Sequence, residues 1–364
     1  MNHELLNLDL LKQAILKPQI LKPKILKPKP FILTVRGPVS PSELGTCYAH
    51  EHLLGRPPPD TSDDPDFVLG DEEAAAVELK RFRRAGGRAV VEMSTADYGR
   101  DAAGLRRLSE RTGVHIVCAT GYNKDRFSAR HVEGVSVGEL TDRFAAEIQT
   151  GIDGTGVRAG LVKAASTLNS ISPTAERAFR AAARTHRRTG APISTHTEAG
   201  TMALEQIRLL ESEGVDPSHV LIGHMDRRLD VAYHLEVAAT GAALGYDQIS
   251  KEKYYPDVKR AESIAALVDE GYGSHVVLGG DLARRSYWPA YGFAAAPGFS
   301  FILERFVPRL WDVGLGEVEV DDLLIHNPAR ILTFAAPSED RSDAGSGRGD
   351  DRITHRARGN DDVE

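Results

Sequence analysis

Short apolar runs alternate with longer segments of helical periodicity along the middle of the chain. Eight runs of six to nine residues occur, and each precedes a segment that can form a helix. This alternation is typical of parallel strands in βα units. The runs are TCYAHEHLL (46–54), RAVVEMST (88–95), HIVCATGY (115–122), AGLVKAAS (159–166), PISTHT (192–197), HVLIGHMD (219–226), AALGYDQ (242–248) and HVVLGGD (275–281).

The intervening segments carry helix start and stop signals. Segments 71–87, 172–190 and 256–273 begin at Asp, Ser or Pro and end at Gly, as helix caps require. Eight such units match the size and count of a (β/α)8 TIM barrel, because a doubly wound sheet rarely holds so many. We therefore predict a barrel over 34–336, with its active site at the C-terminal ends of the strands.

The two ends of the chain differ from this pattern. Residues 15–29 repeat a pentapeptide, ILKPQ-ILKPK-ILKPK, in which proline interrupts any helix. We interpret 1–33 as a low-complexity Lys/Pro-rich extension that is flexible; a tether for a partner and a mis-assigned start site are the alternatives. The polar segment 337–364 has almost no apolar residues and is predicted to be disordered.

Composition narrows the class of protein. Of the 364 residues, 41% are hydrophobic, and the net charge is −7 with acids and bases interspersed, so no basic stripe predicts nucleic-acid binding. No apolar run reaches the roughly 18 residues that a membrane span needs. The two cysteines, Cys47 and Cys118, are too few for a disulfide framework, which fits a cytoplasmic protein.

Candidate metal ligands occupy the first strand. His50 and His52 are two residues apart in AHEH, so both face one side of the strand, while Glu51 faces the surrounding helices. Two imidazoles at a barrel mouth suit a divalent metal, although an isolated pair of this kind can equally be ordinary polar residues.

Other strands end in similar residues. Lys163 lies within an apolar strand, where an ammonium group is costly unless it is neutralised, paired or chemically altered. His196, His224 and Asp281 each fall where their strands should open into the mouth. A single histidine there is more often a satisfied polar residue, but together they indicate a metal site. Asp226 is interpreted as a supporting or helix-capping residue.

Six motifs carry a resemblance to a known family. Together, and in this order, they resemble the phosphotriesterase-like family of the amidohydrolase superfamily, over about residues 34 to 336. The motifs are HEH (50–52), the Lys163 strand, THTEAG (195–200), IGHMDR (222–227), GGD (279–281) and HNPARIL (326–332).

The resemblance implies two divalent metals, most commonly zinc, with manganese or cobalt as alternatives. It implies that His50, His52 and Asp281 hold the more buried ion and that His196 and His224 hold the more exposed one. Lys163 would be carboxylated to a carbamate that bridges both. We then expect a hydroxide held between the metals to attack an ester, lactone or phosphorus centre, with Asp281 as proton shuttle.

The loops after the last two strands indicate an anionic substrate. They contain Lys251, Lys253, Arg284, Arg285, Tyr287 and Tyr291, a dense set of cations and hydroxyls in the usual phosphate-binding region of this fold. These stretches, with 121–127 and 195–206, resemble the branch that opens pentono-1,4-lactone 5-phosphates. That resemblance implies phosphate binding by Lys253, Arg284 and Tyr287. The segment 165–173 resembles this branch less distinctively than the other stretches do. The resemblance therefore does not assign substrate contacts to the loop that contains it.

Two other functions remain possible from the sequence. A phosphotriesterase or a hydrolase of unphosphorylated lactones would use the same metals with more apolar loops, for which Trp288, Phe293 and Phe299 are available. A non-catalytic metal-binding scaffold is the alternative of another class. A homodimer is possible, but the sequence does not identify the contacting face.

Overall fold

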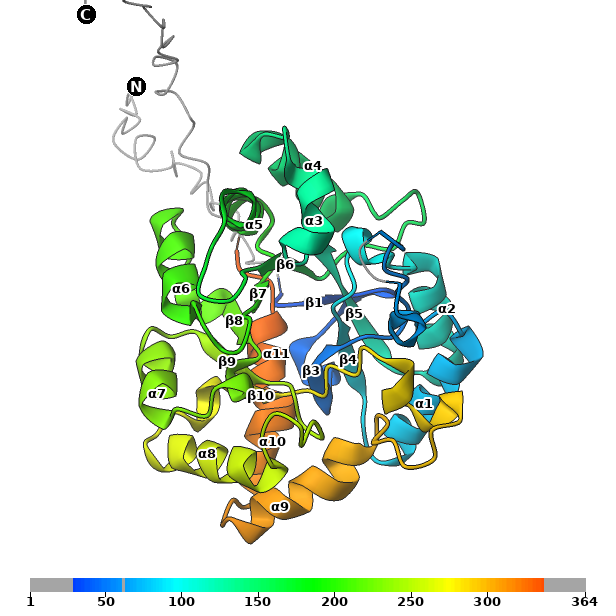
Figure 1. The fold of residues 1–364 in the computed structure, drawn as a ribbon, viewed down its shortest axis with the longest axis vertical. Coiled ribbons are helices and arrows are strands. Elements are labelled where there is room, and N and C mark those ends of the chain that lie inside the picture. The colour runs from blue at the N-terminus through cyan, green and yellow to red at the C-terminus, as the bar shows by residue number, and fades with distance from the viewer. Residues whose placement is uncertain (1–28, 61–62, 337–364) are drawn as a thin grey trace, which may run out of the picture.

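The computed structural model describes residues 29–60 and 63–336, and its central feature is a parallel barrel. Eight strands hydrogen-bond in the order β10-β9-β8-β7-β6-β5-β4-β3, and helices surround them (Figure 1). The Asp281 N–H donates to the His50 carbonyl at 3.0 Å, which links the last strand's exit to the first strand. The predicted (β/α)8 barrel is confirmed, whereas the predictions for 1–28 and 337–364 lie outside the described residues.

Each barrel strand lies inside one of the eight predicted runs. The strands are β3 (Cys47–Glu51), β4 (Ala89–Glu92), β5 (His115–Gly121), β6 (Leu161–Ala165), β7 (Ile193–His196), β8 (Val220–Gly223), β9 (Ala243–Tyr246) and β10 (Val276–Leu278). Nearly all of their residues are buried, because both faces of a parallel barrel strand are covered.

The helices follow the strands in the order that a barrel requires. Side-chain caps begin several of them; Asp71, for example, accepts from the Glu73 and Ala74 N–H groups at the start of α1. The helices are α1 (Glu72–Arg84), α2 (Ala102–Thr112), α3 (Asp125–Val132), α4 (Val137–Gln149), α5 (Pro173–Thr189), α6 (Ala203–Ser212), α7 (Val231–Ala239), α8 (Asp257–Asp269), α9 (Val307–Asp312), α10 (Glu317–Asp321) and α11 (Asn327–Leu332).

A short hairpin and the last helix close the end of the barrel opposite the strand exits. The hairpin strands β1 (Ile32–Thr34) and β2 (Gly37–Val39) pair antiparallel and were not predicted. Ile32 and Leu332 are buried with interior residues of the strands, including Cys47 and Val117. This end is therefore filled with apolar side chains, and a functional site is expected at the opposite end, where the strands exit.

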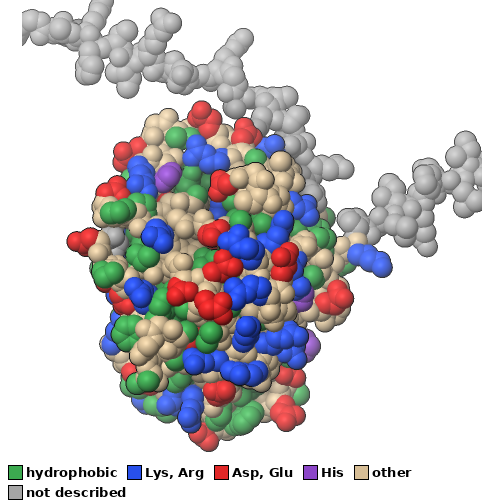
Figure 2. Space-filling model, turned by 90° about the vertical axis from the view of Figure 1, so that its right-hand side faces the viewer, with side chains coloured by type: hydrophobic (Ala, Val, Ile, Leu, Met, Phe, Trp, Pro, Cys, Tyr) green, Lys and Arg blue, Asp and Glu red, His purple; other side chains and the backbone are tan. Residues whose placement is uncertain are grey.

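The outer surface mixes charges of both signs. On the face that carries α1 and α2, basic and acidic side chains are interspersed (Figure 2), and Arg107 pairs with Glu72 at 2.8 Å. Among the described residues, none of the helices has the length and apolar character to cross a membrane.

Candidate metal centre

The six residues predicted as metal ligands meet at the strand exits and line one pocket. They come from five βα units, so residues more than 200 positions apart lie together. Carboxyl ends of parallel barrel strands converge on one mouth, which explains the arrangement. The six are His50, His52, Lys163, His196, His224 and Asp281.

An irregularity in β3 directs its histidines toward this mouth. Ala49 packs in the interior against Leu221 and Val277, so strict alternation would turn His50 away from the interior. The register between β3 and β4 shifts between Tyr48 and Glu51. Such bulges re-aim side chains beside active sites, and here His50 and His52 both reach the pocket.

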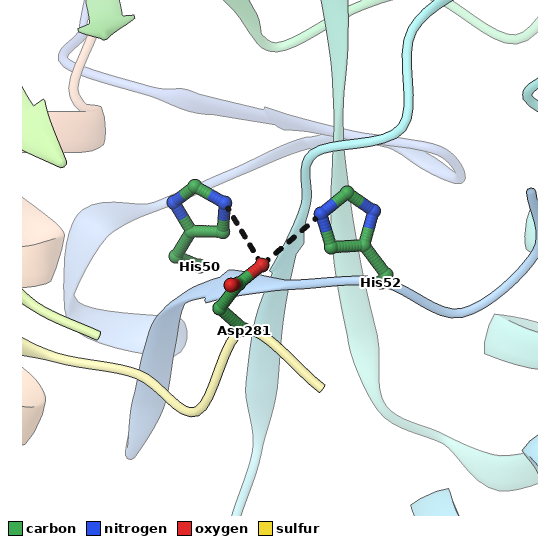
Figure 3. Close-up of side chains that lie close together, drawn as sticks. All are labelled: His50, His52 and Asp281. Carbon is green, nitrogen blue, oxygen red and sulfur yellow. Dashed lines mark ion pairs between the residues drawn. The ribbon is translucent and has the colours of Figure 1, made fainter. Parts of the chain in front are cut away.

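His50, His52 and Asp281 form a compact group of potential ligands. The Nε2 atoms of His50 and His52 lie 3.7 and 3.3 Å from the same Asp281 oxygen, Oδ1, and Figure 3 shows both rings directed at that carboxylate. Their donor atoms lie within 4.8 Å of one another, close enough to hold a metal ion. Ser94 Oγ lies 2.8 Å from His52 Nδ1 and fixes that ring from behind.

Asp247, which directly follows β9, supports two of the histidines. Its carboxylate lies 2.6 Å from His224 Nδ1 and 3.2 Å from His50 Nδ1, which leaves the Nε2 atoms for other partners. Burial opposes ionisation, but His224 and His50 hold the pKa of this carboxyl below its usual range. Asp247 was not among the predicted site residues, although its position at a strand end was an available signal.

The histidines meet the requirements of metal ligands. Among the described residues, the buried Nε2 atom of His50 has no hydrogen-bond partner, and such atoms are rare unless something else binds them. His196 Nε2 is also buried, and its nearest carboxylate oxygen, on Glu198, is 3.5 Å away. Burial lowers the pKa of His50 to about 4 and that of His196 to about 3, so both rings are neutral near pH 7. Neutral imidazole is the form that binds metals. The residues therefore fit a divalent ion.

Lys163 is buried within the same cluster. Its Nζ donates to the Met93 carbonyl at 3.0 Å, and burial lowers its pKa even though nearby carboxylates oppose the shift. A lowered pKa favours the neutral amine, which is the nucleophilic form of lysine.

Two of these ligand candidates have left-handed backbones. His224 has φ of 61° and Asp281 has φ of 44°, a conformation that is unfavourable outside glycine and tends to cluster at functional sites. Glu51 holds the second turn, because its carboxylate accepts from Gly280 N–H at 2.7 Å and Leu282 N–H at 3.1 Å. Glu51 itself does not line the ligand pocket, so it acts on this turn from outside the pocket.

Asp226 supports the loop that carries Asp247. It accepts from the N–H groups of Asp247 and Gln248 and pairs with Arg260 Nε at 2.8 Å, with both side chains buried. Of the two interpretations made from the sequence, the supporting one applies, since no helix begins at Asp226.

The second oxygen of Asp281 also has partners. Oδ2 accepts from Lys251 Nζ at 2.7 Å and from Gln248 Nε2 at 2.8 Å. Lys251 is buried and donates to the Asp281 carbonyl as well. Lys251 was predicted among the loop cations. Its contact with Asp281 was not predicted, because that contact depends on how the two loops pack.

The three residues predicted to bind phosphate do not all line the pocket. Arg284 and Tyr287 line the pocket, and Lys253 is exposed, with its Nζ 2.9 Å from the Tyr287 hydroxyl. Arg284 pairs with Asp64 at 3.0 Å and with Asp66 at 3.2 Å, so its charge is compensated.

Comparison with known proteins identifies the family. A model of the phosphotriesterase family matches residues 30–332. A phosphotriesterase homology protein of Escherichia coli (strain K12) is 38% identical over 292 residues, 79% of this chain and 98% of the relative. A phospho-furanose lactonase of Mycoplasmopsis synoviae (strain 53) is 31% identical over 324 residues, 84% and 92% of the two chains. A solved lactonase structure from Listeria monocytogenes matches with a TM-score of 0.81 at 36% identity, covering 84% of this chain and all of that one. The chain belongs to the phosphotriesterase family.

Proposed function

We propose that the protein is a binuclear metal-dependent hydrolase that opens a phosphorylated sugar 1,4-lactone. The observation that carries this proposal is the meeting of six ligand-type side chains in one pocket. Relatives and a structural neighbour named as lactonases support the reaction class, and a relative named phospho-furanose lactonase supports the phosphorylated substrate.

Each ligand candidate has a role in this proposal. His50, His52 and Asp281 would hold one ion, His196 and His224 would hold the other, and Lys163, as a carbamate, would be a ligand shared by the two. Two zinc ions, or manganese or cobalt, would supply an activated water and polarise the substrate's carbonyl oxygen. The chain's contribution is to fix the imidazoles through Nδ1 contacts such as that of Asp247 with His224, so that Nε2 faces the pocket.

Asp281 is the residue that we propose to accept the proton. Its Oδ2 is already hydrogen-bonded to Lys251 and Gln248. Proton uptake on that oxygen therefore requires one of these bonds to open, since a carboxylate oxygen that accepts from an ammonium group holds protons poorly. We infer that the Asp281–Lys251 contact, rather than Asp281 alone, controls the transfer to the leaving alkoxide.

The pocket lining favours an anionic substrate over a neutral triester. Cations outnumber carboxylates in this lining. Besides Lys163, it contains Lys124, Arg126, Arg227, Lys251 and Arg284, and its two carboxylates are Glu198 and Asp281. Phe67, Tyr98 and Phe127 supply apolar surface, which keeps the unphosphorylated lactone and the phosphotriester as alternatives. The scaffold alternative is less favoured because a scaffold needs no complete ligand set. A cytoplasmic location and a homodimer remain proposals.

Hydrolysis of a matched pair of substrates tests the function. The protein, loaded with zinc, is given a pentono-1,4-lactone with and without its 5-phosphate, beside a neutral phosphotriester. We expect a strong preference in kcat/KM for the phosphorylated lactone and loss of activity with a chelator. Preference for the bare lactone or triester would keep the metal centre and reject the phosphorylated substrate.

Two variants separate the parts of this proposal. Lys163→Ala should abolish most activity, and retention of two metals with full rate would contradict the bridging role. Lys253→Ala should chiefly raise KM for the phosphorylated lactone, because a lost phosphate contact acts on ground and transition states alike. Lys259→Ala is the matched control, since Lys259 is exposed and pairs with Glu262 on the same helix.

A further inference from the structure

An ion pair in the pocket wall has no part in the proposed metal centre or in the proposed phosphate contacts. Lys124, which follows β5, donates from Nζ to Oε2 of Glu198, which follows β7, at 2.5 Å. Both side chains line the pocket and are 27% exposed. Three strands separate β5 from β9 in either direction around the barrel (Figure 1). Lys124 therefore extends into the pocket from the side opposite the strand that Lys253 follows.

The pair has hydrogen-bonding groups left for a ligand. Glu198 Oε1 accepts no hydrogen bond from any residue in 29–60 or 63–336, and the nearest Arg227 nitrogen is 4.0 Å from it. An ammonium group carries three donors, and Lys124 uses one of them in this pair. Asn123 also lines the pocket and is fixed by Thr95, whose Oγ1 accepts from its Nδ2 at 2.8 Å. A hydroxyl group both donates and accepts, so an adjacent carboxylate and ammonium match it.

Glu198 also lies beside the proposed metal ligands. Its Oε2 is 3.5 Å from Nε2 of His196, and the centroids of the His196 and His224 rings are 4.5 Å apart. In a 1,4-lactone the carbonyl carbon bonds to C2 on one side and to the ring oxygen on the other, and the carbon that carries C5 lies beyond that oxygen. The C2 hydroxyl and the 5-phosphate therefore lie on opposite sides of the reacting carbon.

We infer that Glu198 and Lys124 bind the C2 hydroxyl of the lactone, with the carboxylate accepting a hydrogen bond from it and the ammonium donating one to its oxygen. The inference rests on the proposed function and narrows the substrate to lactones with a hydroxyl beside the carbonyl carbon. Such a site is selective, because a substrate without the hydroxyl leaves these partly buried charges without that partner. Glu198 and Lys124 are thus specificity-determining residues.

Calorimetric binding of ribose 5-phosphate and of 2-deoxyribose 5-phosphate to the zinc-loaded protein tests this assignment. The two probes differ only in the C2 hydroxyl, and neither is a lactone, so the comparison does not depend on lactone hydrolysis. The wild-type protein should bind ribose 5-phosphate roughly 10- to 100-fold more tightly, the usual gain from a hydrogen bond to a charged group. Glu198→Ala should bring this ratio close to one. Lys124→Met should lower it less, because the carboxylate remains.

Glu205→Ala is the matched control. Glu205 lies on α6, pairs with Arg208 at 3.7 Å and does not line the pocket, so the ratio should stay at the wild-type value. A wild-type ratio close to one would overturn the inference. Equal loss of affinity for both probes in Glu198→Ala would also overturn it, because an ion pair that only joins the two loops acts on both probes alike. If Glu198→Ala does not fold, Lys124→Met decides by the same ratio. Absence of lactone hydrolysis beside the expected binding ratios would overturn the proposed function and support the hydroxyl contact.

Discussion

At the scale of single residues, the candidate site depends on carboxylates that orient other side chains. Asp247 is the clearest case, because one buried carboxylate contacts Nδ1 of both His224 and His50. These contacts orient both rings so that Nε2, and not Nδ1, is left for a metal. Asp226 and Arg260 in turn hold the backbone of Asp247.

Asp247→Asn tests this orientation directly. The amide can keep the shape but supplies only one acceptor and no charge, so metal affinity should fall by roughly 10- to 100-fold. Metal content after dialysis against a graded chelator series would measure it. Asp230→Asn is the control, because Asp230 caps α7 away from the pocket. Equal metal retention in both variants would mean that Asp247 has no orienting role.

The candidate ligands could be predicted at this scale, but their partners could not. His50, Lys163 and His196 lie in strands, and His52, His224 and Asp281 lie in the exits that follow strands, where periodicity and fold geometry locate them. The contacts of Arg284 with Asp64 and Asp66 join loops about 220 residues apart, and no local pattern indicates them. His50 faces inward because the register between β3 and β4 shifts between Tyr48 and Glu51. The alternation of residue types along a strand does not indicate such a shift.

At the scale of elements, the segment between β9 and α8 brings Gln248, Lys251 and Tyr254 to the pocket. Arg260 of α8 anchors this segment from beneath. It is fully buried, pairs with Asp226 at 2.8 Å and Asp257 at 2.9 Å, and donates to the Lys251 carbonyl at 3.3 Å. The barrel strands and the helices between them were predicted because apolar residues recur regularly along each element. The anchoring contacts of Arg260 join different elements, so no repeating pattern in the sequence indicates them.

Arg260→Met should therefore destabilise the protein and loosen this segment. Removing one member of a buried charged network leaves its carboxylate partners uncompensated, at a cost of about 3–5 kcal/mol in the free energy of unfolding. Urea denaturation would measure it. Arg309→Met is the matched comparison, because Arg309 contacts the same Asp257 from a 40% exposed position, and its loss should cost less than about 1 kcal/mol. Similar losses in the two variants would contradict the anchoring role.

At the scale of the whole molecule, the residues that stabilise the closed end of the barrel lie apart from the residues that we propose for catalysis at the strand exits. The strand exits carry charged and strained residues such as His224 and Asp281. The opposite end is closed by the β1–β2 hairpin and α11, where Ile32 and Leu332 pack against strand interiors. The sequence predicted the barrel but not this hairpin, since two strands of three residues each give too short a period to recognise.

Ile32→Ala tests whether the two ends are independent. Ile32 is fully buried among Cys47, Val117 and Leu332, so truncation should leave a cavity and cost about 2–5 kcal/mol of unfolding free energy. Because the cavity lies at the closed end, metal content, KM and kcat should stay at wild-type values below the melting transition. Thermal unfolding and steady-state kinetics on one preparation measure both, with the exposed Leu168→Ala as control. A change in metal content or KM without loss of stability would mean that the closed end is coupled to the site. If metal content and KM stay unchanged while stability falls, Ile32 contributes to stability alone. This is expected in a TIM barrel, where one end carries the active site and the other end contributes to stability.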